Sequence, residues 1–411
     1  MEKQTQKLKE VETNWEELKK KVREHKKRQL KRAALVVACC AAAVIAFYVI
    51  SQVKTYNKYK TIDEIERADT SATSFDLFRG KILKYSNDGA IYTDQENNII
   101  WNQTFEMDSP LVAKNDTYVA FADINGQDIF VMDASGLQGT IKTNMSIKKI
   151  DVAAQGTVAV LMENQRTSYL ALYNIEGELL AEGAIHMENS GYPMDIALSD
   201  DGKKLAVAIL DVVSGSVKTT LSFYNFGTVG QNEIDNIVNT YSYAGNIIPK
   251  IEYVDDSTML AFADTGVMIF QGSQVPELAN EVMVSSEIKS IFYDDSYFGL
   301  IQLDNEVENG RKMVVYDMKG SEVTSAVLDM AYDQVYFLNN HEICVQNGNQ
   351  IQIYTLYGVK KFESTFTSEV YYVLNGIGVR NYFVLMEGST EQIRCKFFSS
   401  TRFEEKTEEE K

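Results

Sequence analysis

The chain has 411 residues, of which 45% are hydrophobic and 11% aromatic, and it contains only four prolines, so it can build a sizeable core and is not largely disordered. Its net charge of −18 is unevenly divided: residues 1–32 carry twelve Lys/Arg and six Glu, whereas after residue 60 there are 52 acidic and 25 basic residues. Because so acidic a body repels a phosphate backbone, nucleic acid is not an expected partner.

Residues 1–32 are predicted to form a basic amphipathic helix in the cytoplasm. The apolar residues of this segment recur alternately three and four positions apart, at Leu8, Val11, Trp15, Leu18 and Val22. That spacing places them on one face of a helix, which indicates self-association or docking of a partner helix. The alternative is a helix that lies on the anionic lipids of the inner leaflet.

Residues 33–53 are predicted to cross the lipid bilayer as a single helix. The run from Ala33 to Ile50 has no charge, and its length suits a hydrocarbon core of about 30 Å. The basic arm before it is too long, and the apolar run too extended, for a cleaved signal peptide. Because the bases precede the span, the N-terminus is expected in the cytoplasm of a single-pass cell-membrane protein. Residues 54–74 are predicted to be a juxtamembrane helix and linker, with the body outside the membrane.

The body is predicted to be an all-β, multi-bladed β-propeller over residues 75–399. Blocks of roughly 40 residues can be superimposed, and each reads as four short strands separated by turn residues. A recurring phrase, Tyr-(Asp/Asn)-x-x-Gly, fits a hairpin in which the glycine takes a positive φ. It occurs at Tyr173 to Gly177 and at Tyr316 to Gly320.

Block starts near residues 75, 109, 147, 192, 247, 287, 332 and 370 favour eight blades. A chain-terminal strand from elsewhere would help to close the last one. Seven blades is the near alternative, and two stacked β-sandwiches explain the period less well. Residues 400–411 are predicted to be an acidic disordered tail, since they have nothing to bury.

No catalytic, metal-binding or cofactor-binding motif is recognised, and the protein is not expected to be an enzyme. The histidines (His25, His186, His341) are far apart in the sequence, and the paired acids recur in turns between first and second strands, as at Asp294-Asp295. Cys39 and Cys40 lie in the apolar run. Cys344 and Cys395 are interpreted as two buried hydrophobes, with pairing across neighbouring repeats as the alternative.

The fourth block departs most from the period and supplies the candidate ligand-binding surface. Its first strand follows a Gly-Tyr-Pro phrase, one hairpin is elongated, and a polar loop precedes its last strand. Insertions on one blade often carry a binding surface, although they also tolerate neutral change. The candidate residues are Tyr192, Pro193, Asp195, Tyr224, Asn225, Gly227 and Gln231.

The phrases from Gly191 (GYPMDIALSDDGKKLAVA) and from Phe223 (FYNFGTVGQNEID) add a family resemblance. With the basic arm, the single anchor and Trp101, the chain resembles a family of membrane-anchored bacterial propellers from clostridium-like Gram-positive bacteria. That family is catalogued as a domain of unknown function (number 5711). The resemblance implies an extracytoplasmic propeller with no assigned activity.

Three hypotheses for function remain open at the level of sequence. The favoured one is a non-enzymatic protein-binding or scaffold module of the cell envelope, with an envelope protein as its partner. The second is a receptor for a small ligand or glycan that signals through the anchor helix. The third is an envelope hydrolase whose carboxylates come from separate blades.

Overall fold

The computed structural model describes residues 2–69, 72–213, 215–304 and 310–396. The chain separates into two compact units, 1–54 and 55–411. In the first, α1 (Glu2–Val53) is one continuous helix that includes the predicted arm and the predicted span. Its segment His25–Ile50 is long and apolar enough to cross a membrane. The predicted tail, 400–411, lies outside the described residues, as do residues 397–399 of the predicted propeller.

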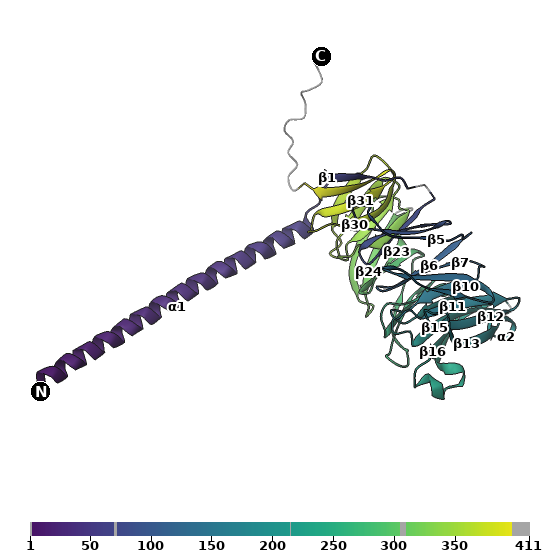
Figure 1. Cartoon of the computed structure of the whole chain (residues 1–411), viewed down its shortest axis with the longest axis horizontal. Coiled ribbons are helices and arrows are strands. Elements are labelled where there is room, and N and C mark those ends of the chain that lie inside the picture. Colours follow the sequence, from purple (N-terminus) through teal and green to yellow (C-terminus); the bar gives the residue numbers. More distant parts are fainter. Residues whose placement is uncertain (1, 70–71, 214, 305–309, 397–411) are drawn as a thin grey trace, which may run out of the picture. The chain divides into compact units, whose positions relative to one another are not determined.

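The second unit is an eight-bladed β-propeller, in which every blade is a four-stranded antiparallel sheet (Figure 1). Blade 1 comprises β2 (Ser74–Phe78), β3 (Lys81–Ser86), β4 (Gly89–Thr93) and β5 (Ile99–Thr104), and blade 2 comprises β6 (Pro110–Lys114), β7 (Val119–Asp123), β8 (Asp128–Asp133) and β9 (Gly136–Lys142). Blade 3 comprises β10 (Ser146–Val152), β11 (Val158–Asn164), β12 (Thr167–Tyr173) and β13 (Leu179–His186), and blade 4 comprises β14 (Tyr192–Leu198), β15 (Lys204–Val213), β16 (Ser216–Asn225) and β17 (Ile237–Ala244).

Blade 5 comprises β18 (Lys250–Tyr253), β19 (Thr258–Ala263), β20 (Gly266–Gln271) and β21 (Glu277–Met283), and blade 6 comprises β22 (Ile288–Tyr293), β23 (Tyr297–Asp304), β24 (Gly310–Asp317) and β25 (Glu322–Leu328). Blade 7 comprises β26 (Gln334–Phe337), β27 (Ile343–Asn347), β28 (Gln350–Tyr354) and β29 (Lys360–Thr365), and blade 8 comprises β30 (Val370–Asn375), β31 (Asn381–Met386), β32 (Ser389–Cys395) and β1 (Tyr59–Glu66). The eight predicted block starts lie within three residues of the observed first strands. The prediction of eight blades is therefore confirmed.

The predicted hairpin phrase forms the turn between third and fourth strands. In blade 3 the Asn174 side chain accepts a hydrogen bond from the Glu178 amide at 2.7 Å, and Gly177 has a φ of 83°. In blade 6 Asp317 accepts hydrogen bonds from two backbone amides, and Gly320 has a φ of 78°. The side-chain oxygen and the positive φ are what the sequence phrase predicted.

The prediction that residues 54–74 are a helix and linker is wrong, because β1 is the outermost strand of blade 8. It pairs antiparallel with β32, from Tyr59 opposite Cys395 to Glu66 opposite Ser389. In Figure 1 the N-terminal colour of β1 therefore appears beside the C-terminal colours of β30 and β31. Just before it, Tyr56 is 1% exposed and forms a bridge with Phe362 of blade 7. The segment that follows α1 thus closes the ring.

The first turns of successive blades, between first and second strands, meet one another on one face of the ring. The Ala154 amide of blade 3 donates to the Asp200 carbonyl oxygen of blade 4 at 2.9 Å. The Asp201 amide of blade 4 donates in turn to Asp256 Oδ1 of blade 5 at 2.6 Å. The paired acids therefore lie in turns, as the sequence predicted, and several of them gather on this face.

Both cysteines of the propeller are free thiols within the core shared by blades 7 and 8, so the interpretation as buried hydrophobes is confirmed. Burial raises the pKa of Cys344, and likewise that of Cys395, to about 12. Since only a thiolate reacts readily, we expect neither to be labelled by a thiol reagent in the folded protein at pH 8. Both should react after unfolding in denaturant. Detection by mass spectrometry of a label on either cysteine under native conditions would contradict this burial.

Candidate functional site

In blades 1 to 7 the fourth strand has a bulge near the end of the third strand, and the residue that follows this bulge differs from blade to blade. At three junctions this residue donates a hydrogen bond to a backbone carbonyl of the next blade. These bonds run from Trp101 Nε1 to Asp133 at 3.0 Å, from Asn239 Nδ2 to Pro276 at 3.0 Å and from Asn280 Nδ2 to Lys319 at 2.6 Å. A side chain of this kind fills the outer part of the seam between two blades.

At the junction of blades 3 and 4 the same position is Ala181, and a groove opens there. Ala181 follows the bulge opposite Leu172, as Trp101 follows the bulge opposite Tyr92. Its methyl group is too short to reach the next blade. In blade 4 the tight third turn is also replaced by a loop with two short 3₁₀ helices, η1 (Gly230–Asn232) and η2 (Ile234–Asn236). A cavity of about 580 Å³ lies beside Ala181 and this loop.

The groove has an apolar floor and polar groups along its walls. Its floor includes Leu170 and Leu205, which belong to the core between the two blades. Tyr224 lines the wall beside Asp235, and burial raises the pKa of its phenol to about 12, with a further contribution from Asp235. Lys218 lies at the same wall and forms an ion pair with Asp211 at 3.5 Å. The site can therefore hold an apolar group and orient a polar one.

The two sides of the groove differ in how their backbones are held. On one side β13 is the outermost strand of blade 3, so one of its edges faces away from the sheet. On the other side Asp235 and Asn236 have φ values of 56° and 60°, in the left-handed region. Consecutive non-glycine residues there are uncommon and often occur in binding loops. Exposed apolar residues adjoin both walls along the chain: Leu180, which precedes Ala181, is 55% exposed, and Ile234, which precedes Asp235, is 85% exposed.

The candidate surface residues predicted from the sequence do not form one surface. Tyr192 pairs with Leu210 at one end of the blade 4 sheet, whereas Tyr224 pairs with Leu205 at the other. Of the seven, Tyr224 lines the groove, and Gln231 lies in η1 of the adjoining loop.

The remaining predicted residues serve the fold locally. The Asn225 side chain is 1% exposed: its Nδ2 donates to the Gln274 carbonyl oxygen of blade 5 at 2.7 Å, and its Oδ1 accepts a hydrogen bond from the Gly227 amide. Pro193 is buried in β14. Sequence reasoning missed the opposite wall, β13. The small size of Ala181 was not a sufficient signal, since the still smaller Gly139 holds the same place in blade 2, where the backbone lies against the Ile175 carbonyl oxygen of blade 3.

Asp195 belongs to a separate charged cluster on the innermost strands of blades 3 to 5. It is 3% exposed and accepts a hydrogen bond from the Ile251 amide of the next blade at 3.0 Å. The ammonium groups of Lys149 and Lys250 lie 3.3 Å and 3.4 Å from its two carboxylate oxygens. Lys250 also pairs with Glu252 at 2.7 Å. These charges neutralise one another and join three blades, which indicates a structural role.

Asp151 in the same cluster should make stability depend on pH. Burial, with a further contribution from Glu252, raises its pKa from 3.8 to about 8. Between these values the folded state binds a proton that the unfolded chain releases. Protonation of Asp151 therefore stabilises the folded state fully below about pH 4, and this stabilisation is lost as pH rises through about 8. The free energy of unfolding falls by no more than about 1.4 kcal/mol per pH unit. Urea unfolding at several pH values should show that the free energy of unfolding depends less on pH in Asp151→Asn than in the wild type. Equal pH dependence in the two proteins would contradict the raised pKa of Asp151.

The fold is shared with solved propellers of low sequence identity. The Saccharomyces cerevisiae protein Sqt1 matches with a TM-score of 0.52 and 12% identity, over 82% of this chain and 99% of that one. The C-terminal WD40 domain of Sif2 matches with a TM-score of 0.51 and 12% identity, over 83% of this chain and 99% of that one. At such identities the likeness shows the fold alone. No curated protein matches the sequence.

A family model extends over nearly all of the propeller. It matches residues 52–395 and so includes β1, in agreement with the role of that strand in closing the ring. Its description is a family of unknown function, DUF5711. The chain belongs to this family.

Proposed function

We propose that the chain is a single-pass membrane protein whose extracytoplasmic propeller binds an envelope protein without catalysing a reaction. The observation that carries this proposal is the groove between blades 3 and 4, with its apolar floor and exposed apolar flanks. Exposed apolar groups beside a partly apolar groove are typical of protein-interaction surfaces. The propellers that resemble this chain support a binding scaffold only through their common fold.

The form of the groove favours an extended segment of the partner. The free edge of β13 offers backbone donors and acceptors along one wall, and an extended peptide can pair with such an edge. The segment's apolar side chains would enter the cavity over Leu170 and Leu205. Its ends would cover Leu180 and Ile234, which are otherwise in contact with water.

The placement outside the membrane is supported by the charge distribution. The twelve lysines and arginines of residues 1–32 precede the apolar stretch, and the strongly acidic body follows it. Basic residues favour the cytoplasmic side. In this orientation the arm contacts anionic inner-leaflet lipids or a partner helix, while the groove faces the cell envelope.

Site-specific photo-cross-linking in intact cells tests the proposal. A photoreactive amino acid at Ile234, which is 85% exposed beside the groove, should give a discrete adduct with an envelope protein. Ile377 of blade 8 is 93% exposed and serves as the matched control, which should give no such adduct. Equal adducts at both positions, or none at Ile234, would argue against the groove as the binding surface.

A second variant pair distinguishes the groove from the loop beside it. A Cβ at Gly183 meets no atom within 4 Å, so Gly183→Trp can project a large side chain into the groove without disturbing β13. We expect it to reduce the Ile234 adduct at least about tenfold, as blocking a buried anchor does. Gly183→Ala, which leaves the groove open, should retain the adduct. Loss in both variants would point to the fold instead of the groove.

A small-molecule receptor is the second candidate, because a cavity of about 580 Å³ lies within the usual size range of ligand sites. The receptor hypothesis predicts that a glycan or small apolar ligand raises the thermal unfolding midpoint of the wild-type protein but not that of Gly183→Trp. A protein adduct at Ile234 without any such ligand would favour the scaffold.

A further inference from the structure

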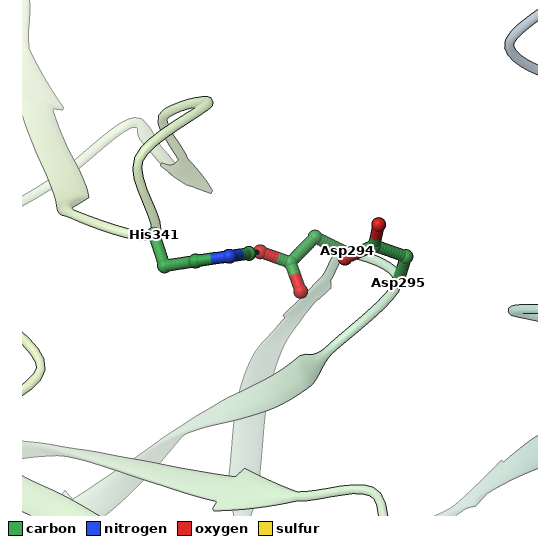
Figure 2. Close-up of side chains that lie close together, drawn as sticks. All are labelled: Asp294, Asp295 and His341. Carbon is green, nitrogen blue, oxygen red and sulfur yellow. Dashed lines mark hydrogen bonds and ion pairs between the residues drawn. The ribbon is translucent and has the colours of Figure 1, made fainter.

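A separate cluster of metal-ligating side chains lies on the first turns of blades 6 and 7. Asp294 and Asp295 lie between β22 and β23, and His341 lies between β26 and β27 (Figure 2). One ligand atom from each of the three residues lies within 4.8 Å of the other two. His341 Nδ1 is 2.7 Å from Asp294 Oδ2, across the junction of the two blades.

The turns hold these groups in position before any ion is bound. Asp294 Oδ1 accepts hydrogen bonds from the Ser296 and Tyr297 amides at 2.8 Å and 2.7 Å, which directs Oδ2 toward the imidazole. The ring of Tyr297 packs edge-on against that of His341 with 5.2 Å between centroids. Fixed side chains reduce the entropy lost when an ion binds.

The same turns in blades 4 and 5 show what a purely structural acid pair looks like. In blade 4 the buried ammonium of Lys204 lies 3.1 Å from both oxygens of Asp201. In blade 5 Asp255 accepts its hydrogen bonds within its own turn, from Ser257 and Thr258. Blade 6 differs, because its acid pair meets a side chain from another blade that can donate a nitrogen lone pair to a cation.

We propose that Asp294, Asp295 and His341 bind a divalent transition-metal ion of the zinc class. An imidazole nitrogen with two carboxylate oxygens suits such an ion, whereas calcium and magnesium prefer oxygen ligands alone. Three protein ligands leave at least one coordination position for water or for a group from another molecule. The ion would also link blades 6 and 7.

The size of the cluster is compatible with this ion. Metal–ligand distances of about 2.0 to 2.2 Å place tetrahedral ligands about 3.3 to 3.6 Å apart. The 2.7 Å bond between His341 and Asp294 must therefore lengthen by less than about 1 Å, while Asp295, which is exposed, moves inward.

Zinc titration of the full chain in detergent, after treatment with a chelator, tests the site. Calorimetry should detect one saturable Zn²⁺ site with a Kd near micromolar, about a thousandfold tighter than adventitious binding near 1 mM. His341→Asn suits the left-handed φ of 60° and removes the imidazole, and Asp295→Asn removes one carboxylate. Each should weaken Zn²⁺ binding at least about tenfold.

The matched control is His186→Asn, which removes an exposed histidine of blade 3 and should leave the Kd unchanged. Circular dichroism confirms that each variant is folded before the titration. Equal Kd values in the wild type, His341→Asn and Asp295→Asn would overturn the proposal. Absence of saturable binding by the wild type below about 1 mM would overturn it as well.

Discussion

A protein that begins at residue 54 is expected to fold as a stable propeller, and one that begins at residue 74 is not. The longer chain retains β1, which pairs with β32 and completes blade 8. The shorter chain keeps the first strands of all eight blades but leaves β32 at an open edge. The difference isolates the contribution of the segment that directly follows α1.

The expected difference in the free energy of unfolding is about 5 kcal/mol or more. Tyr56 and Tyr59 are lost together with the strand; the first is 1% exposed, and the second stacks on Phe366 at 5.1 Å. Burial of an aromatic side chain such as Tyr56 contributes about 1.5 to 3 kcal/mol, the half-buried Tyr59 contributes less, and the β1–β32 backbone hydrogen bonds add to this. Chemical denaturation followed by circular dichroism measures the difference. Equal midpoints for the two chains would show that β1 does not close the ring.

The blade pattern could be predicted from the sequence because many of the second strands are nearly continuous apolar runs. β11 and β19, for example, are largely or wholly buried, and turn residues bound them on both sides. β1 gave no such signal. Its sequence, YKTIDEIE, is mostly polar, and none of its residues is fully buried, because an outermost strand packs only partly against its neighbours. Its assignment depends on pairing with β32 at the other end of the chain.

The two candidate sites were predictable to different extents. The loop that contains Asp235 stood out as an insertion, so one wall of the groove was found, but the other wall is β13, a regular fourth strand with no signal of its own. His341 and Asp294 are 47 positions apart, and neither lies in a motif of its own. Their contact follows from the order of blades around the ring, which a local pattern does not contain.

The second large effect is expected at a buried ion pair in the core of blades 7 and 8. Lys361 and Glu342 form this pair, and their side chains are 1% and 4% exposed. Tyr382 donates a hydrogen bond from its hydroxyl to the other carboxylate oxygen, Glu342 Oε2, at 2.7 Å. The Lys361 carbonyl oxygen also accepts from the Tyr56 amide at 2.7 Å. The pair therefore lies beside the segment that joins the ring to α1.

Glu342→Gln should destabilise the propeller by about 3 to 5 kcal/mol, because it leaves the Lys361 ammonium buried without its counter-charge. The double variant Glu342→Gln/Lys361→Met removes both charges and should recover at least half of that loss, since an apolar or neutral replacement of a whole buried pair is often tolerated. Urea unfolding of the wild type, both single variants and the double variant gives the coupling energy. Strictly additive losses would mean that the two charges do not stabilise each other. Strong coupling would mean that the ring near its closing segment is stabilised by this charge pair as well as by the pairing of β1.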